Sequence, residues 1–162
     1  MNTYKTAYFG ELNLDETSDY EYFDLTFNNE AMYISLSNFS EYREKIQDCM
    51  GIIDAYAELF ESGKAAITEN YAENEVIRYY FKYHFDTLDK KILVQLFGTD
   101  NFDDFSIEKT AEKLSPPDVA FTIEFGEINL SVDFRVSKEY SDEVLSIKMD
   151  EVFNILDFTR EN

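Results

Sequence analysis

The sequence predicts an α+β fold, in which an antiparallel β-sheet built from N- and C-terminal strands carries a central helical segment on one face. Two runs, residues 20–36 and 119–136, alternate between apolar and polar side chains, as strands with one wet face do. Between these runs, apolar residues recur every three or four positions, the period of an amphipathic helix. This order of elements is typical of α+β domains, and no βαβ crossover is indicated. We therefore expect one domain, residues 1–162, with strands in 1–37, helices in 38–114 and strands in 118–158.

The N-terminal strands are predicted to form hairpins. The run from Tyr20 to Leu36 is interrupted by Asn28-Asn29-Glu30, and asparagine tolerates the left-handed backbone that a tight hairpin needs. Two shorter strands, residues 4–9 and 12–14, are expected around Gly10.

The first helix is predicted from apolar residues spaced by three and four positions between Tyr42 and Phe60. Asn38 followed by Glu41 fits a capping box at its start, and Gly63 is expected to end it. A second helical piece is expected over residues 65–71.

The later helices are delimited by glycine, serine and proline. Residues 75–97 predict a helix with a break near Asp89, and Gly98 is a suitable stop. Ser106 is a suitable cap for a short helix that ends at Leu114, because Pro116-Pro117 forbids its continuation.

The C-terminal strands end in a predicted hairpin, with residues 144–149 and 152–158 joined across Asp150-Glu151. One internal similarity links the two ends of the chain, since Phe9–Leu14 and Phe125–Leu130 agree at five of six positions. The similarity indicates either two related sheet-forming halves or the same kind of glycine turn used twice. We favour the second interpretation, because repeat arrays need more copies.

The composition favours a folded acidic binding protein. The 162 residues include 34 acidic and 14 basic side chains, for a net charge of −20, yet 44% are hydrophobic, which is too many for a disordered acidic tail. Such a surface repels nucleic acid. With one histidine and one cysteine, the chain offers few of the groups that catalysis needs. We expect no enzyme, no catalytic residues, no cofactor and no metal site.

The compartment is predicted from what the sequence lacks. Cys49 is the only cysteine, so no internal disulfide forms, which suits a reducing cytosol. Residues 1–6 lack the features of a signal peptide, and no run of 18 apolar residues occurs. We expect a cytoplasmic protein that does not enter a membrane.

Several residues have both a functional and a structural interpretation. His84 lacks a neighbouring motif for acid–base chemistry, and Cys49 lies on an apolar stripe, so we expect both to be buried packing residues. The loop Asp100–Asp104 lacks EF-hand spacing and is expected to be a solvated acidic loop. Tyr79 and Tyr83 could anchor a partner, but we expect core positions.

The uneven charge predicts where a partner binds. The net charges of residues 1–37, 38–97 and 98–162 are −6, −4 and −10, so the sheet-forming ends are more acidic than the helical middle. Carboxylates among tyrosines are then expected on the wet face of the sheet, where they speed encounter with a basic protein. The alternative is that the acidity only confers solubility. The predicted partner-binding residues are Tyr22, Asp24, Tyr33, Glu124, Glu127 and Asp133.

Two stretches carry a resemblance to a known family. Phe9–Leu14 with the hairpin of residues 20–36, and the segment Tyr140–Asp150, resemble the bacterial family called domain of unknown function 2004. The resemblance brings no catalytic residues. Small acidic α+β proteins of this kind are similar to bacterial immunity proteins, which neutralise a toxin, and that is the function the resemblance implies.

The leading hypothesis is therefore an immunity or inhibitor protein that binds a basic toxin or effector, such as a nuclease. An alternative is a nucleic-acid mimic that blocks a defence protein, although Arg135 interrupts the best row of carboxylates. An enzyme with an unmarked carboxylate site and an oligomeric scaffold, such as a homodimer, are the remaining alternatives. Four questions stay open: the identity of the partner, the oligomeric state, which face binds, and whether the N- and C-terminal strands share one sheet.

Overall fold

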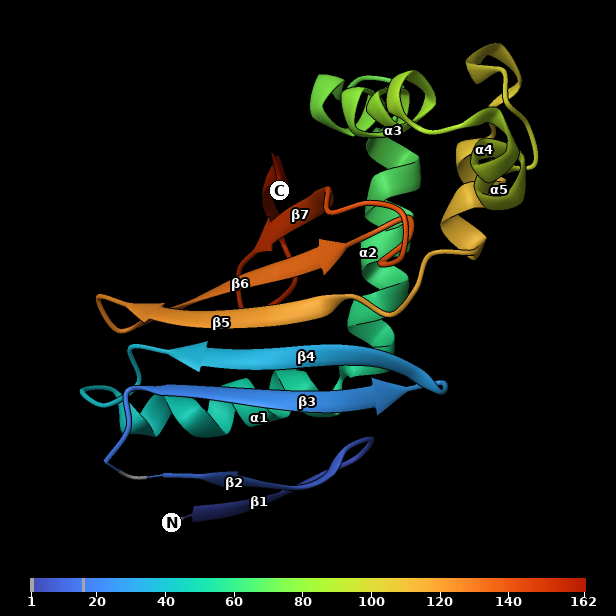
Figure 1. Cartoon of the computed structure of the whole chain (residues 1–162). Helices are drawn as coiled ribbons and strands as arrows, with labels where there is room; N and C mark the ends of the chain where they lie inside the picture. The colour runs from blue at the N-terminus through green and yellow to red at the C-terminus, as the bar shows by residue number, and fades with distance from the viewer. Residues whose placement is uncertain (1, 16) are drawn as a thin grey trace.

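The computed structural model describes residues 2–15 and 17–162, and it has the predicted α+β class. Its main sheet has six strands in the order β3-β4-β5-β6-β7-β8, and a separate hairpin pairs β1 with β2 (Figure 1). Strands from both ends of the chain therefore share one sheet. The strands are β1 (Asn2–Thr6), β2 (Gly10–Leu14), β3 (Tyr20–Phe27), β4 (Glu30–Ser37), β5 (Asp118–Glu124), β6 (Glu127–Phe134), β7 (Val144–Met149) and β8 (Ile155–Glu161).

The two halves of the sheet meet at a parallel pair. Strands β4 and β5 run in the same direction, with Ile34 opposite Val119 and Ser37 opposite Thr122, whereas all other neighbours in the sheet are antiparallel. The helical segment between them is thus a crossover connection, and the expectation that the chain has none is wrong. Alternation along a strand reports which face a side chain occupies, but it carries no information on strand direction.

Five α-helices lie between β4 and β5. They are α1 (Ile46–Asp54), α2 (Tyr56–Asn70), α3 (Glu75–Thr87), α4 (Lys90–Phe97) and α5 (Ile107–Glu112), with 3₁₀ turns η1 (Arg43–Lys45) and η2 (Phe102–Asp104). None of these helices is long and apolar enough to cross a membrane.

Four expectations about the first helices are wrong, one of them the separate piece over residues 65–71, which belongs to the end of α2. The run from Tyr42 to Phe60 breaks at Ala55, which separates α1 from α2, and Gly63 lies inside α2 rather than at a helix end. Gly63 is there because the ring of Phe134 lies against it, too close for a larger residue. Asn38 does not cap a helix, since it has a left-handed backbone, with φ of 62°, just after β4.

The later boundaries are close to those predicted, except that α5 ends at Glu112 and not at Leu114. A break at Asp89 separates α3 from α4, and Gly98 ends α4 with φ of 75°. The Ser106 hydroxyl accepts the Lys109 N–H at 3.3 Å and caps α5. Asn74 caps α3 in the same way, by accepting the Ile77 N–H at 3.1 Å.

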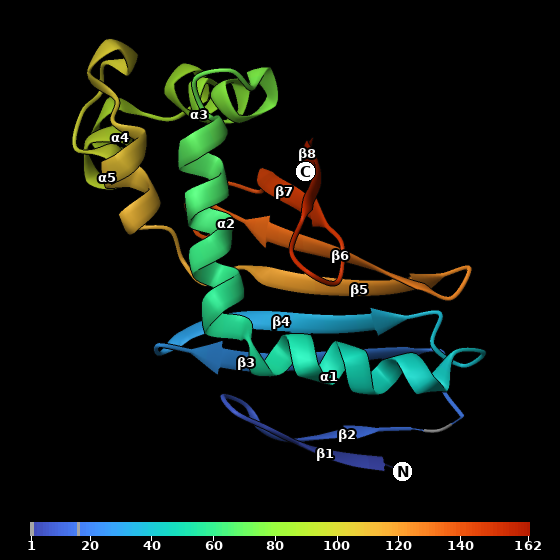
Figure 2. The ribbon, with the colours of Figure 1, turned by 180° about the vertical axis from the view of Figure 1, so that it is seen from behind.

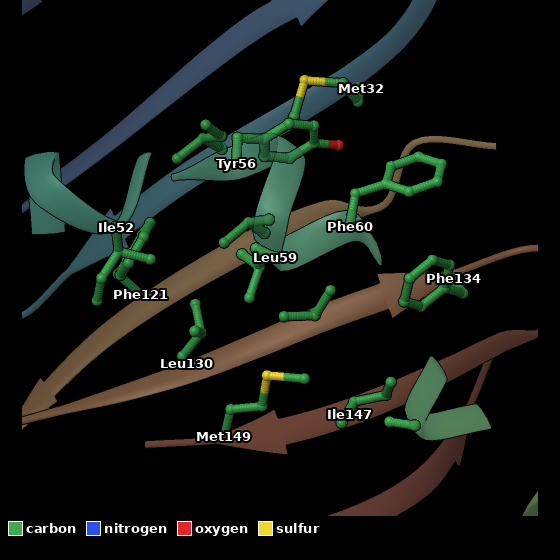
Figure 3. Close-up of a cluster of buried hydrophobic side chains, with 14 of the residues drawn as sticks. Met32, Ile52, Tyr56, Leu59, Phe60, Phe121, Leu130, Phe134, Ile147 and Met149 are labelled. Atoms are coloured by element: carbon green, nitrogen blue, oxygen red, sulfur yellow. The ribbon is translucent and has the colours of Figure 1, made fainter. Parts of the chain in front are cut away.

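The main core lies between the sheet and the two helices α1 and α2, which cross its back face (Figure 2). In the close-up, Leu59 and Phe60 of α2 lie over the apolar side chains of the sheet (Figure 3). The buried Tyr56 donates its hydroxyl to the Pro117 carbonyl at 2.6 Å, which fixes α2 to the start of β5. The sheet residues labelled in this cluster are Met32, Phe121, Leu130, Phe134, Ile147 and Met149.

A second group of aromatic rings holds α3, α4 and the η2 turn together. Phe85 stacks on Phe97 with ring centroids 5.0 Å apart, and Phe102 stacks on Phe105 at 5.6 Å. Phe81 joins the same group through Phe105 at 5.1 Å. These contacts pack the short helical elements against one another.

The similar segments at residues 9–14 and 125–130 form different turns. Phe125 and Gly126 are the two central residues of the tight β5–β6 hairpin, whereas Gly10 is already the first residue of β2 and follows a longer turn. Both glycines have positive φ. This difference supports the interpretation that glycine supplies turns twice, without a related pair of halves.

The last hairpin is longer than predicted. The Asp150 carboxylate accepts the N–H groups of Val152 and Asn154 at 3.1 and 2.9 Å, and Phe153 has φ of 67°. This side-chain-stabilised turn delays β8, which therefore begins at Ile155.

Candidate functional site

The candidate site lies on the face of the six-stranded sheet opposite α1 and α2, which we call the open face; it faces the viewer in Figure 1. The strand register aligns one polar residue from each strand across this face. Asp24 lies opposite Tyr33 and Asp118 opposite Asp133, while Ser146 follows on β7. We call these residues, with Thr159 on β8, the polar row.

At one end of the polar row, two tyrosines and an aspartate form a compact patch. The rings of Tyr22 and Tyr33 stack with centroids 5.0 Å apart, and Asp24 is the cross-strand neighbour of Tyr33. Tyr22 is 45% exposed and Asp24 is also exposed. We call Tyr22, Asp24 and Tyr33 the tyrosine–aspartate patch. The sequence predicted all three residues for one surface, and the structure brings them together.

The electrostatics of this patch keep both tyrosines neutral. Partial burial, reinforced by the charge of Asp118, raises the pKa of Tyr33 to about 12. Partial burial and the neighbouring Asp24 also raise the pKa of Tyr22. Both phenols therefore keep their protons and can donate hydrogen bonds next to carboxylates.

Asp118, which the sequence did not single out, has a structural role at the centre of the face. It is only 2% exposed and accepts the Tyr33 N–H at 2.9 Å. Lys138 lies 3.4 Å from the same carboxylate oxygen and donates to the Ala31 carbonyl at 2.6 Å. Burial raises the pKa of Asp118, and these contacts stabilise the start of the β4–β5 pair. Its partners are too distant in sequence to mark it among 34 acidic residues.

Asp133 is hydrogen-bonded within the sheet. Its Oδ1 atom accepts the hydroxyls of Ser131 and Ser146 at 2.7 and 2.6 Å. Lys148 donates to the Ser131 oxygen at 3.1 Å and lies 3.5 Å from the Glu161 carboxylate. The network joins β6, β7 and β8.

Glu124 and Glu127 lie at the other end of the face. They are directly opposite each other at the end of the β5–β6 hairpin, and both are exposed. Six residues along β6 separate Glu127 from Asp133, which is about 20 Å of strand. The six predicted residues therefore share one face but form two separate groups, and Asp133 lies in the polar row with the first of them.

The two expected packing residues, His84 and Cys49, are both buried. The Nδ1 atom of His84 donates to the Tyr80 carbonyl at 2.8 Å, since a carbonyl can only accept, and Nε2 then accepts the Ser141 hydroxyl at 2.7 Å. Burial lowers the pKa of His84 and raises the pKa of Cys49 to about 12. These environments favour a neutral imidazole and an unreactive thiol.

The acidic loop after α4 is organised by its own side chains, because Asn101 accepts the Asp103 N–H at 3.0 Å. Within the described residues, no three side chains of the ligating types come together in a way that could hold a metal ion.

Tyr79 is not a core residue, contrary to expectation. It is 56% exposed, and the Arg160 guanidinium lies 4.4 Å from its ring centroid. Tyr79 lines a hollow of about 600 Å³ together with Phe102 and three cations, which we call the α3 groove. The cations are Arg78, Lys82 and Arg160.

Comparison of the chain with protein-family models, with curated proteins and with solved structures finds no match.

Proposed function

We propose that this chain is a non-enzymatic binding protein of the immunity or inhibitor type, which neutralises a basic toxin or effector, such as a nuclease, by covering it with the open face. The observation that carries this proposal is the tyrosine–aspartate patch, in which exposed aromatic surface, neutral hydroxyl donors and a carboxylate lie together. The resemblance to the domain of unknown function 2004 family and the cytoplasmic location stay predictions.

The tyrosines are suited to supply affinity. Tyrosine covers a large contact area with few rotatable bonds, and it is enriched among the residues that dominate binding energy. Stacking of Tyr22 on Tyr33 holds both rings in place before a partner arrives, which reduces the entropy lost on binding.

The negative charge is suited to speed the association with a basic partner and to select against acidic proteins. A net charge of −20 attracts a basic protein from a distance and repels acidic ones. Asp118 and Asp133 are engaged inside the sheet, so Asp24 is the carboxylate of the polar row most available to a cation. Binding at this patch therefore pairs local contacts with a favourable long-range field.

The nucleic-acid mimic is the weaker candidate. A mimic of duplex DNA needs a dense row of charges, because DNA places one charge per about 1.7 Å of its axis. In the polar row, neutral Tyr33 separates Asp24 from Asp118, Ser146 and Thr159 carry no charge, and Lys138 neutralises Asp118. This spacing favours the inhibition of a basic toxin or effector over the imitation of duplex DNA.

The test is capture from a lysate of the source organism on the immobilised chain at low salt, followed by a salt step. The double variant Tyr22→Ser with Asp24→Asn removes the patch. A matched control, Tyr79→Ser with Asp103→Asn, makes the same chemical changes elsewhere on the surface. We expect the wild type and the control to release one basic protein whose activity the chain inhibits, and the patch variant to lose it. Equal binding by all three forms would contradict the proposal.

A further inference from the structure

The β5–β6 hairpin ends in a phenylalanine that contacts almost nothing in its own chain. Phe125 is 96% exposed, more than any other large apolar residue in the described part of the chain. It lies at the tip of the hairpin, in the turn that joins the opposed residues Glu124 and Glu127. Exposing this ring to water is unfavourable, so its position is not explained by the stability of the fold.

The backbone makes the choice of phenylalanine more unusual. Phe125 and Gly126 are the two central residues of the turn, with φ of 53° and 77°. The β3–β4 hairpin has the same two-residue turn with Asn28 and Asn29, at φ of 52° and 64°. Asparagine and glycine are the residues this turn favours, whereas a bulky aromatic in the left-handed region is an outlier. The chain therefore makes the same turn elsewhere without an aromatic residue.

The charges on either side of Phe125 also destabilise the β5–β6 hairpin. Glu124 and Glu127 occupy directly opposed positions, and like charges that face each other across a hairpin destabilise it. At the corresponding place in the other hairpin, Glu30 lies opposite the apolar Phe27. Three unfavourable features thus coincide at one tip: an exposed ring, a left-handed aromatic and a pair of opposed carboxylates.

We propose that the hairpin tip, residues 124–127, is the anchor of the interface: Phe125 enters an apolar pocket on the basic partner, and Lys or Arg side chains at the rim of that pocket pair with Glu124 and Glu127. A partner of this chemistry buries the ring and places positive charge between the opposed carboxylates. The inference rests on the proposed function, and it adds an insertion element about 20 Å along the face from the tyrosine–aspartate patch.

The surface beside Phe125 has complementary chemistry. A hollow of about 590 Å³ adjoins the ring, and its lining includes the carboxylates of Asp19, Glu41 and Glu124. Asp19 accepts the Ser40 N–H at 2.8 Å, which lowers its pKa and keeps it charged, and the nearby Arg43 acts in the same direction. A cationic side chain next to the partner's apolar pocket would fit this hollow.

A second copy of this chain is the less favoured occupant. Its α3 groove combines aromatic rings with three cations, as the expected pocket does, although Glu75 also lines it. Each copy, however, carries a charge of −20, so two copies repel each other as they approach. A basic protein meets the tip with attraction at long and at short range.

The test replaces Phe125 of the full chain by the photoreactive amino acid p-benzoylphenylalanine, which keeps an aromatic side chain, and irradiates the source cells. A matched control carries the same group at Val94, a half-exposed position on α4. We expect position 125, and not position 94, to cross-link one basic protein within an apolar segment that contains Lys or Arg. No adduct at 125, the same adducts at both positions, or an adduct to the α3 groove of a second copy would overturn the inference.

A second measurement separates failure of the inference from failure of the proposed function. The variant Phe125→Asn adopts the residue of the other hairpin, so we expect a higher urea midpoint and, toward the captured partner, at least ~10-fold weaker binding. If the wild type captures no basic protein, the proposed function fails. If the wild type and Phe125→Asn bind that protein equally, only the anchor fails. A lower urea midpoint for Phe125→Asn would show that the fold needs the ring, and would also overturn the anchor.

Discussion

Gly63 of α2 lies directly against the ring of Phe134 on β6, so that a Cβ atom at position 63 would be 2.6 Å from two atoms of the ring. The contact lets the helix approach the sheet closely. At the same point, the rings of Phe60 and Phe134 pack edge to face, with centroids 6.1 Å apart. A glycine in the middle of a helix is unfavourable by itself, and this close approach is the reason for it.

The variant Gly63→Ala is expected to destabilise the protein by about 1–3 kcal/mol, because the added methyl group displaces a buried ring. Urea unfolding followed by circular dichroism measures the change. The control Gly51→Ala, at an exposed position of α1 where nothing lies within 4 Å, should instead stabilise the protein by about 0.5–1 kcal/mol. Equal stabilisation of both variants would contradict the close packing of α2 on β6.

Tyr80 holds the two ends of the loop between β6 and β7. Its buried hydroxyl accepts the Val136 N–H at 3.1 Å and donates to the Glu143 carbonyl at 3.2 Å. We expect Tyr80→Phe to lower the free energy of unfolding by about 1–3 kcal/mol, because the Val136 and Glu143 backbone groups lose their partner. The exposed Tyr79→Phe change serves as the control and should shift the same unfolding curve little. An unchanged free energy of unfolding in Tyr80→Phe would contradict this role of the hydroxyl.

The single histidine permits a direct titration. Burial lowers the pKa of His84, so NMR of the imidazole nitrogens should give a value below the usual one of about 6.5, with the proton on Nδ1. Because the folded-state pKa is the lower one, its contribution to stability is present above about pH 6.5 and is lost as the pH falls through the folded-state pKa. The difference in unfolding free energy between the wild type and His84→Gln should therefore become smaller as the pH falls below about 6.5. A measured pKa above 6.5 would contradict the buried neutral imidazole.

Asp118 is expected to give the opposite pH dependence. Its pKa in the folded state is raised by burial, so its contribution to stability is fully present below about pH 3.9 and declines as the pH rises through the folded-state pKa. The difference in unfolding free energy between wild type and Asp118→Asn should therefore move in favour of the variant from acid toward neutral pH. If the wild type instead became more stable relative to Asp118→Asn as the pH rose, the ion pair with Lys138 would contribute more than the cost of burying the charge.

The sequence predicted well the features that depend on short separations along the chain. Alternation placed Tyr22, Asp24 and Tyr33 on one face, and Asn28-Asn29 fixed the hairpin that makes them neighbours. Features that depend on long-range packing were missed. The glycine inside α2 is explained only by Phe134, which lies far along the sequence, and the parallel pairing of β4 with β5 depends on the path of the helices.

The same distinction applies to the candidate site. Opposed positions for Glu124 and Glu127 follow from a tight hairpin, but their distance from the tyrosine–aspartate patch depends on strand order, which alternation does not report. Asp118 could not be recognised, because its partner Tyr33 lies 85 residues away. The exposure of Phe125 was also missed, because it continues the alternating apolar pattern of β5 into the turn.

The most direct test of the account is the association rate of the chain with its captured basic partner, measured by stopped flow at low and at physiological salt. We expect fast association at low salt that slows as the salt rises, and a patch variant, Tyr22→Ser with Asp24→Asn, that associates more slowly and dissociates faster than the Tyr79→Ser with Asp103→Asn control. Association that is independent of salt, with identical rates for the patch and control variants, would contradict an acidic open face as the binding surface.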